Sequence, residues 1–224
     1  MTFHTIEETY WTLVTKQAEQ RGQPLTSFGR DVAQTILTGG LLAYEDRLKG
    51  TPQYRVISAP TGSGKSSYAF ALMAALIKAV PGSSALFLCE TIDQCEDTYL
   101  ELIKLIDPVH VGVWTSAHDR RKEMEVIERE HGFAPSARFF AEDLTSCPVA
   151  VVTHKFRQGP RGELARDFQG QPRTLTIVDE RPKEVSIFDI DQGDVGKARD
   201  WAVLKFGDDS PAVDALKALH SFLG

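Results

Sequence analysis

Residues 59–67 read APTGSGKSS, and this stretch decides the fold. It follows the P-loop pattern G-x-x-x-x-G-K-[ST] at Gly64, Lys65 and Ser66, with Ala59 at the position of the first glycine. The β-branched run before it, YRVIS (54–58), predicts a short strand, and the apolar run after it predicts a helix over 66–80. A glycine-rich loop between a strand and a helix is the setting in which this pattern binds phosphate.

The residue types in this loop explain how it would hold a nucleotide. Gly62 and Gly64 let the backbone turn so that successive N–H groups point inward, and the new helix adds its unpaired N–H groups and its dipole. We expect Lys65 to reach the β- and γ-phosphates and the Ser66 hydroxyl to ligate Mg²⁺. The alternative, a glycine-rich turn that binds nothing, fits the flanking strand and helix poorly. The predicted nucleotide-binding residues are Thr61, Gly62, Ser63, Gly64, Lys65, Ser66 and Ser67.

A second motif, TLTIVDERP (174–182), supplies two carboxylates at the end of an apolar strand. In a parallel sheet, Asp179 would emerge at the carboxyl edge from which the P-loop also starts. Asp179 is therefore predicted to hold Mg²⁺ together with Ser66, and Glu180 to orient and deprotonate an attacking water. The predicted catalytic residues are thus Lys65, Asp179 and Glu180. The alternative is an acidic pair that caps a strand-to-loop turn.

The rest of the chain alternates between strand and helix patterns. Residues 1–50 are predicted to form a helical preface, and residues 51–224 one α/β domain that closes with helices over 194–207 and 210–223. Apolar runs separated by helices are typical of a parallel sheet covered on both faces. The further strands are expected at 85–89, 109–114, 137–140, 148–154 and 174–180, and the further helices at 91–106 and 119–132.

Composition limits the class of protein. The chain has 224 residues, a net charge of −6 and a sequence pI near 5.5, so no global basic charge attracts nucleic acid. Cys89, Cys95 and Cys147 form no CxxC pair, which indicates reduced thiols and a cytoplasmic location. We expect no signal peptide at the start and no membrane association, because the longest apolar run, 68–80, is too short to span a bilayer.

Together the two motifs carry a family resemblance. APTGSGKS resembles motif I of the superfamily 2 helicases and translocases, and VDERP resembles their motif II, the D-E-x-x box of DEAD and DEAH proteins. Arg181 and Pro182 depart from both spellings, which leaves the subfamily open. The resemblance implies a P-loop NTPase of the RecA-like fold as the first motor domain, with ATP and Mg²⁺ as ligands.

Two weaker matches lie between these motifs. ALFLCETIDQ (85–94) resembles motif Ia, and PVAVVTHKF (148–156) resembles motif Ib, whose loops contact the nucleic-acid backbone. The resemblance therefore implies contacts from Thr91, Thr153 and His154 to DNA or RNA, without sequence readout. The alternative is that these residues are ordinary strand ends and helix caps.

The resemblance also implies a second motor domain, which supplies arginine fingers. Only a short stretch follows VDERP, with no motif III or motif VI, so we expect slow hydrolysis unless a second domain or partner chain acts in trans. Gln34 and Gln53 are candidates for holding adenine, and neither is assigned. Solvated surface charge is expected for the arginines that follow motif Ib, namely Arg157, Arg161, Arg166 and Arg173.

Three other functions share parts of this pattern. A phage-type packaging ATPase has the same Asp–Glu strand end, and a nucleotide kinase has a basic lid for which residues 154–166 are a candidate. A non-catalytic nucleotide-binding module is the third. Intact Lys65, Ser66, Asp179 and Glu180 argue against a fully degenerate site.

Overall fold

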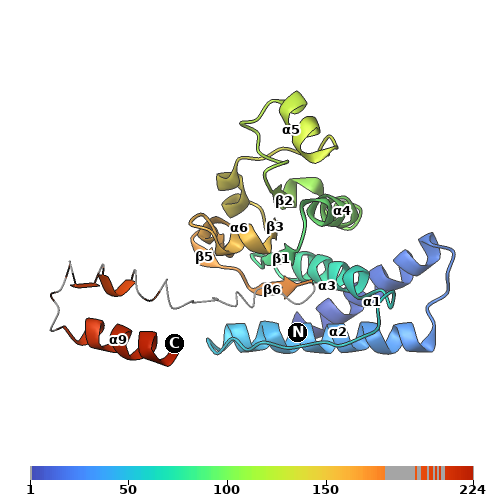
Figure 1. Cartoon of the computed structure of the whole chain (residues 1–224). Coiled ribbons are helices and arrows are strands. Elements are labelled where there is room, and N and C mark those ends of the chain that lie inside the picture. Colours follow the sequence, from blue (N-terminus) through green and yellow to red (C-terminus); the bar gives the residue numbers. More distant parts are fainter. Residues whose placement is uncertain are drawn as a thin grey trace. The chain divides into compact units, whose positions relative to one another are not determined.

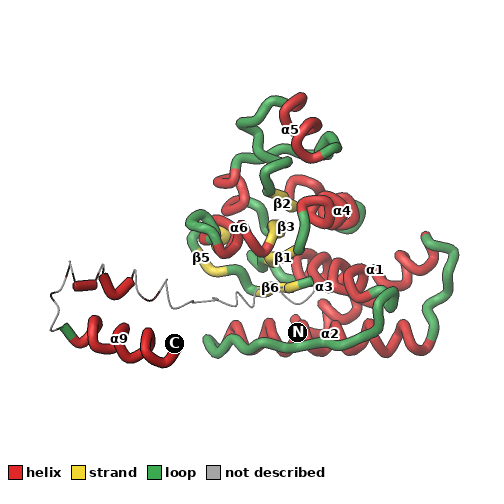
Figure 2. The backbone as a smooth tube through the Cα atoms, viewed as in Figure 1, coloured by secondary structure: helices red, strands yellow, loops and turns green. Residues whose placement is uncertain are grey.

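The computed structural model describes residues 2–179, 195, 198–200, 202, 203, 205, 207 and 210–223. It forms two compact units, residues 1–182 and residues 183–224 (Figures 1 and 2). The second unit contains helix α9 (Pro211–Leu223), which matches the helix expected at 210–223. The helix expected at 194–207 lies mostly outside the described residues.

The first unit is an α/β fold around a parallel sheet, as the sequence predicts. Among the described residues the sheet has four strands in the order β2-β3-β1-β6, and each neighbouring pair is parallel. Cys89 pairs with Thr153, and Leu88 pairs with Val178, so the carboxyl ends of these strands meet at one edge. The strands are β1 (Ala85–Cys89), β2 (Val111–Trp114), β3 (Val149–Thr153) and β6 (Leu175–Val178).

Alternate residues of each strand pack into two separate cores. Phe87, Val113 and Val151 join the larger core with the helices α1 to α4, whereas Leu86, Leu88 and Val152 join a smaller core on the other face. Successive side chains of a strand point to opposite faces of the sheet. A strand that is buried on both faces therefore has a near-continuous apolar sequence. The helices of the larger core are α1 (Thr2–Gln20), α2 (Ser27–Leu48), α3 (Lys65–Ala79) and α4 (Ile92–Leu102).

Short helices and a two-stranded hairpin make up the rest of the first unit, and some of them cover the smaller core. Leu144 of η2 and Ala165 of α7 are buried in the smaller core, and Phe156 of α6 packs against it. The elements are the 3₁₀ helices η1 (Pro108–His110) and η2 (Ala141–Ser146), the helices α5 (Met124–His131), α6 (His154–Gln158) and α7 (Glu163–Arg166), and the hairpin of β4 (Asp167–Phe168) and β5 (Gln171–Pro172).

The helical preface is confirmed as two helices and packs directly on the sheet domain. Tyr10 is fully buried and donates its hydroxyl to the Ala33 carbonyl at 2.8 Å, which ties α1 to α2. Burial raises the pKa of Tyr10, so the phenol stays a donor. The turn between the helices ends at Thr26, whose side chain caps α2 by accepting from Gly29 N.

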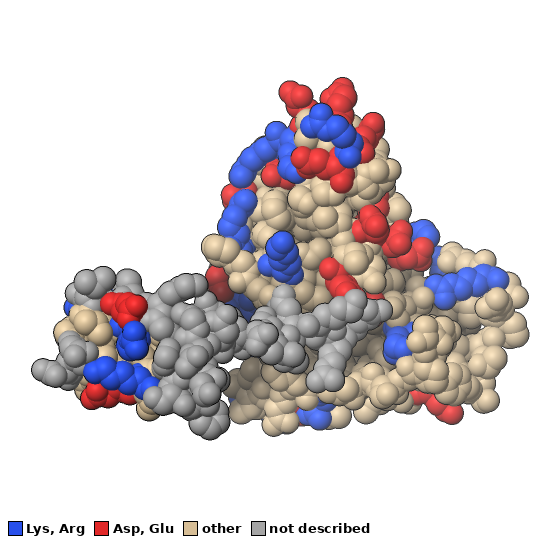
Figure 3. Space-filling model, in the orientation of Figure 1, with Lys and Arg blue, Asp and Glu red and all other residues tan. Residues whose placement is uncertain are grey.

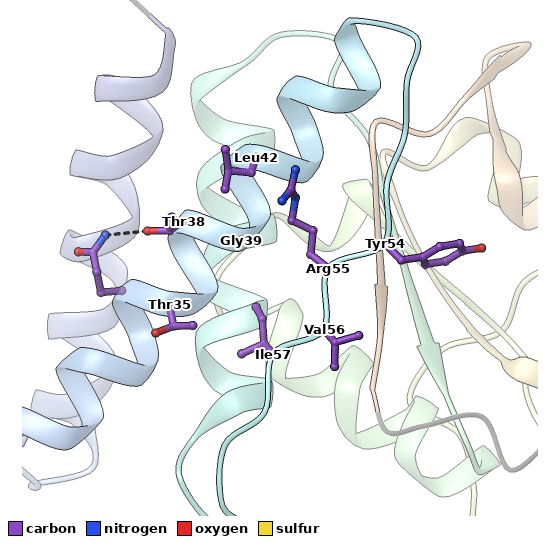
Figure 4. Close-up of a pocket in the computed structure, with 9 residues that line it drawn as sticks. Thr35, Thr38, Gly39, Leu42, Tyr54, Arg55, Val56 and Ile57 are labelled. Atoms are coloured by element: carbon purple, nitrogen blue, oxygen red, sulfur yellow. Dashed lines mark hydrogen bonds between the residues drawn. The ribbon is translucent and has the colours of Figure 1, made fainter.

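The strand predicted at 54–58 is absent, and this prediction is wrong. Tyr54 and Val56 are 100% and 94% exposed, and no ladder hydrogen bond joins this segment to a described strand. Helix α2 holds the segment instead: Arg55 pairs with Asp46, and Ile57 turns toward Gly39 (Figure 4). A β-branched sequence forms a strand only when a partner strand completes its hydrogen bonds.

The expectation that Arg173 carries solvated surface charge is also wrong. Its side chain is 5% exposed and donates to the carbonyls of Ala165, Cys147 and Leu144 at 2.7, 2.9 and 2.6 Å. Burial lowers the pKa of Arg173 to about 10, so it remains charged at neutral pH. Arg173 therefore joins segments on the far side of the smaller core rather than facing water.

Smaller differences concern element ends. The helix expected at 91–106 ends at Leu102, and the one expected at 119–132 begins only at Met124. The expected edge strand at 137–140 is a single bridge between Asp119 and Phe139. Within the described residues, no helix combines the length and apolar character needed to cross a membrane, and all three cysteines are free and buried.

Candidate nucleotide site

The P-loop connects directly to α3 and has the backbone that its glycines predict. Gly62 and Gly64 have φ of 79° and 85°, and Gly64 is the N-cap of α3. A Cβ at Gly64 would lie 3.1 Å from the Tyr68 ring, so this position favours glycine for both conformation and space. The loop forms without the preceding strand because α3 itself is anchored by eight consecutive buried residues, Ala69–Leu76.

The side chains of Lys65 and Ser63 place an ammonium group and a hydroxyl group within the loop. Lys65 Nζ donates to the carbonyls of Ala59 and Pro60 at 2.7 and 3.0 Å, which folds the side chain over the loop. The Ser63 hydroxyl is buried and has no hydrogen-bond partner among the described residues. A buried hydroxyl without a partner costs free energy unless a ligand or water completes its hydrogen bonds.

Ser66 and Asp179 meet although 113 residues separate them. The Ser66 hydroxyl donates to Asp179 Oδ2 at 3.1 Å. Asp179 directly follows β6, and its N–H donates to the Leu88 carbonyl at 3.0 Å, which extends the pairing of β6 with β1. A hydroxyl and a carboxylate oxygen at this separation are ligands of the kind that Mg²⁺ prefers, so the residues present fit the ion.

Glu180, the predicted base, lies outside the described residues, as do Arg181 and Pro182. The other predicted nucleotide-binding residues, Thr61 and Ser67, lie in the loop and in the first turn of α3. Ser67 accepts a hydrogen bond from Arg21 Nη2 at 2.8 Å. Sequence reasoning missed this arginine, because a single basic residue 46 positions before Ser67 has no recognisable pattern.

The three predicted nucleic-acid residues lie at the same edge of the sheet and also have structural roles. Thr91 caps α4 in a capping box with Gln94, and Thr153 caps α6 by accepting from Phe156 N at 3.2 Å. His154 Nε2 lies 3.5 Å from the Asp179 carbonyl oxygen, which places it beside the carboxyl end of β6. The hydroxyls accept from the backbone, so each retains its own O–H for another acceptor.

One open hollow of about 470 Å³ lies between α2 and residues 54–57 (Figure 4). Gln34, a candidate for adenine, lines it and donates to Thr38 Oγ1 at 3.2 Å. None of the residues 61–67 lines the hollow. We therefore assign it no part in phosphate binding.

A buried polar network lies apart from the P-loop and includes His118. His118 is fully buried, with Nε2 2.8 Å from Glu96 Oε2 and Nδ1 2.7 Å from Thr115 Oγ1. Burial lowers the pKa of His118, and the contact with Glu96 opposes this only in part. The neutral ring satisfies both contacts by donating from Nε2 and accepting at Nδ1. Because Thr115 and Glu96 are also buried, the network is structural.

The comparisons with known proteins agree with this geometry. Residues 34–181, well over half of the chain, match the family model ResIII, described as type III restriction enzyme, res subunit. No curated protein matches the chain. The matched range begins within α2 and includes the P-loop, all four strands of the parallel sheet and Asp179. The chain belongs to the ResIII family, a family of DEAD-like helicase first motor domains with the RecA-like P-loop fold.

Proposed function

We propose that this chain binds and hydrolyses ATP·Mg²⁺ as the motor domain of a DEAD/DEAH-like helicase or nucleic-acid translocase. The observation that carries the proposal is the contact between Ser66 Oγ and Asp179 Oδ2, 3.1 Å apart at the start of the P-loop helix. It joins the two motifs at the place where a metal-bound triphosphate needs oxygen ligands. The family match supports an ATP-binding motor domain in general.

Each loop residue has a separate task in this proposal. The N–H groups of residues 61–67 surround the phosphates, and Lys65 exchanges its two carbonyl acceptors for β- and γ-phosphate oxygens. Ser66 and Asp179 would hold Mg²⁺, which when bound neutralises charge on the phosphate oxygens. Glu180, which follows Asp179 in the sequence, would orient the attacking water and accept its proton.

Nucleic acid is the proposed track, contacted through its backbone by Thr91, Thr153 and His154. Their common edge of the sheet supports this, because one strand of nucleic acid would meet all three. On the face that Figure 3 shows, acidic and basic side chains are intermingled around α5. Binding is therefore expected to depend on a few local phosphate contacts, and to be weak for this chain alone.

Hydrolysis by this chain alone is proposed to be slow. In the part of the chain that the structure describes, the hydrogen bonds of Asp179 involve Ser66, Leu88 and His154 and no arginine. An arginine supplied by a second motor domain or partner chain in trans would stabilise the transition-state charge, an effect worth about 10³–10⁵ in rate in GTPases. We propose that such a partner completes the motor.

The experiment is ATP hydrolysis by the purified chain with Mg²⁺, alone and with single- and double-stranded DNA and RNA. Lys65→Ala is the blank, because it removes the phosphate-binding ammonium. Glu180→Gln is the second variant, and it should bind ATP normally while hydrolysis falls about 10²-fold or more. We expect slow turnover that one class of nucleic acid raises and that Lys65→Ala abolishes.

Three results would each contradict a part of the proposal. Equal turnover in the wild type and Lys65→Ala would show that the activity does not come from this site. ATP binding with equal, negligible turnover in the wild type and Glu180→Gln would favour a non-catalytic nucleotide-binding module. Nucleic-acid stimulation that persists in a Thr91→Val, Thr153→Val double variant would refute the assigned contacts, with Thr→Ser at both positions as the control that keeps the helix caps.

A further inference from the structure

An arginine from outside the family match lies against the phosphate loop. Arg21 directly follows α1, and its Nη2 donates to Ser67 Oγ at 2.8 Å, whereas the match begins only at residue 34. Its position is fixed by packing, because α1 lies along α3 and both contribute to the larger core. Tyr10 and Val14, on the same face of α1, are buried there. The packing of α1 on α3 thus brings Arg21 to the start of α3, where one hydrogen bond to Ser67 holds its exposed side chain.

The charges around Arg21 favour an anion. Ser67 lies in the first turn of α3, the positive end of the helix dipole, and that turn contains Lys65 and no acidic residue. The described residues offer Arg21 no ion pair, and its side chain is exposed. A second cation at a helix N-terminus is unfavourable unless an anion is present. The Ser63 hydroxyl in the same loop has no partner among the described residues and is a further donor that such an anion could use.

The position of Arg21 also indicates which phosphate it meets. Ser66 contacts Asp179 and so marks the Mg²⁺ end of the site, where the β- and γ-phosphates lie. Ser67 is the next helical residue and projects about 100° further round the helix. Arg21 therefore approaches the helix start from a different side than Asp179 does. That side is left for the α-phosphate, which the loop also cradles.

Building on the proposed function, we propose that Arg21 donates to the α-phosphate of the bound nucleoside triphosphate. Arginine suits this role because its planar group has five donors and Ser67 occupies only one of them. The α-phosphate is not transferred, so Arg21 would bind ATP and ADP alike and leave the chemical step unchanged. The helical preface would then form part of the nucleotide site as well as part of the core.

The test is calorimetric binding of ATP·Mg²⁺ and ADP·Mg²⁺ to the wild type and to Arg21→Gln. We expect about tenfold weaker binding of both nucleotides, the size of one lost charge-assisted contact. The matched control is Lys16→Gln, the same charge change at an exposed site on α1 five residues before Arg21, which should leave both affinities unchanged. In steady-state hydrolysis KM should rise about tenfold at constant kcat, and the temperature of thermal unfolding without nucleotide should not fall.

Ser67→Ala tests whether Arg21 contacts the nucleotide directly or acts on it only by holding Ser67. The variant removes the hydroxyl that accepts from Arg21 and keeps the arginine. We expect it to weaken nucleotide binding less than about threefold. Equal losses in Ser67→Ala, Arg21→Gln and the double variant would overturn the inference, as would unchanged affinity in Arg21→Gln. A wild type that binds no ATP would refute the proposed function itself, and the Arg21 contact with it.

Discussion

Replacing Arg173 with methionine tests how strongly one buried cation holds the far side of the sheet. The guanidinium donates to carbonyls in η2, α7 and the segment before β3. Leu144 O and Pro148 O also accept backbone N–H groups, from Cys147 and Ala85, so they stay paired without Arg173. Among the hydrogen bonds of the described residues, Ala165 O and Cys147 O depend on Arg173 alone.

The magnitude follows from these two carbonyls. Each buried carbonyl left without a donor costs about 1–3 kcal/mol, which gives about 2–6 kcal/mol for the pair. Methionine offsets part of this loss, because burial of the charged group is itself unfavourable, as the lowered pKa of Arg173 shows. We therefore expect Arg173→Met to lower the free energy of unfolding by about 3 kcal/mol.

The assay is urea denaturation followed by far-ultraviolet circular dichroism. Arg166→Met is the matched control, because Arg166 is about half-exposed in an ion pair with Glu163 and should lose no more than about 0.5 kcal/mol. A midpoint for Arg173→Met that equals the wild-type midpoint, with the same denaturant slope, would refute the reasoning. It would mean that water replaces Arg173 as the donor to these carbonyls with no loss of free energy of unfolding.

Two further predictions concern the loop glycine and pH. Gly64→Ala should lower the free energy of unfolding by about 1–2 kcal/mol, because Gly64 has a positive φ, and should also abolish ATP binding. Gly82 has a similar φ and open space around it, so Gly82→Ala should lower the free energy of unfolding without affecting ATP binding. Calorimetry and thermal unfolding would separate the two effects, and unimpaired ATP binding in Gly64→Ala would contradict them. His118 has a folded-state pKa below its unfolded value, so protons bind the unfolded chain more tightly, and stability should fall as pH drops below about 6.5. Denaturation midpoints between pH 5 and 8 measure this, and the slope should shrink in His118→Asn. An identical slope would contradict the prediction, because it would mean that His118, with its neighbours Glu96, Thr115 and His131, binds protons equally well in the folded and unfolded chains.

Structure could be predicted from the sequence where an element depends on its own residues, or where the residue that it contacts belongs to a recognisable motif. The apolar run Ala85–Cys89 forms a buried strand because both of its faces meet apolar helices. The approach of Ser66 to Asp179 was also predictable, since parallel strands place their carboxyl ends at one edge. The same logic correctly placed Thr91 and Thr153 at that edge.

Sequence reasoning failed where the deciding partner is distant and has no pattern. Residues 54–58 have the composition of a strand, but their contacts come from Asp46 and Gly39 of α2. The sequence predicts surface charge for Arg173 because its acceptors are backbone carbonyls, and every residue type has a carbonyl, so no sequence pattern identifies them. Arg21 reaches Ser67 only through the packing of α1 on α3.

The central claim is that Ser66 and Asp179 form an Mg²⁺ site beside the P-loop. The most direct measurement is ATP affinity with and without Mg²⁺ for the wild type and for Asp179→Asn, which keeps the size of the side chain and removes its charge. We predict that Mg²⁺ strengthens ATP binding to the wild type at least about tenfold and that Asp179→Asn loses most of this gain. An equal effect of Mg²⁺ on both proteins would contradict the account.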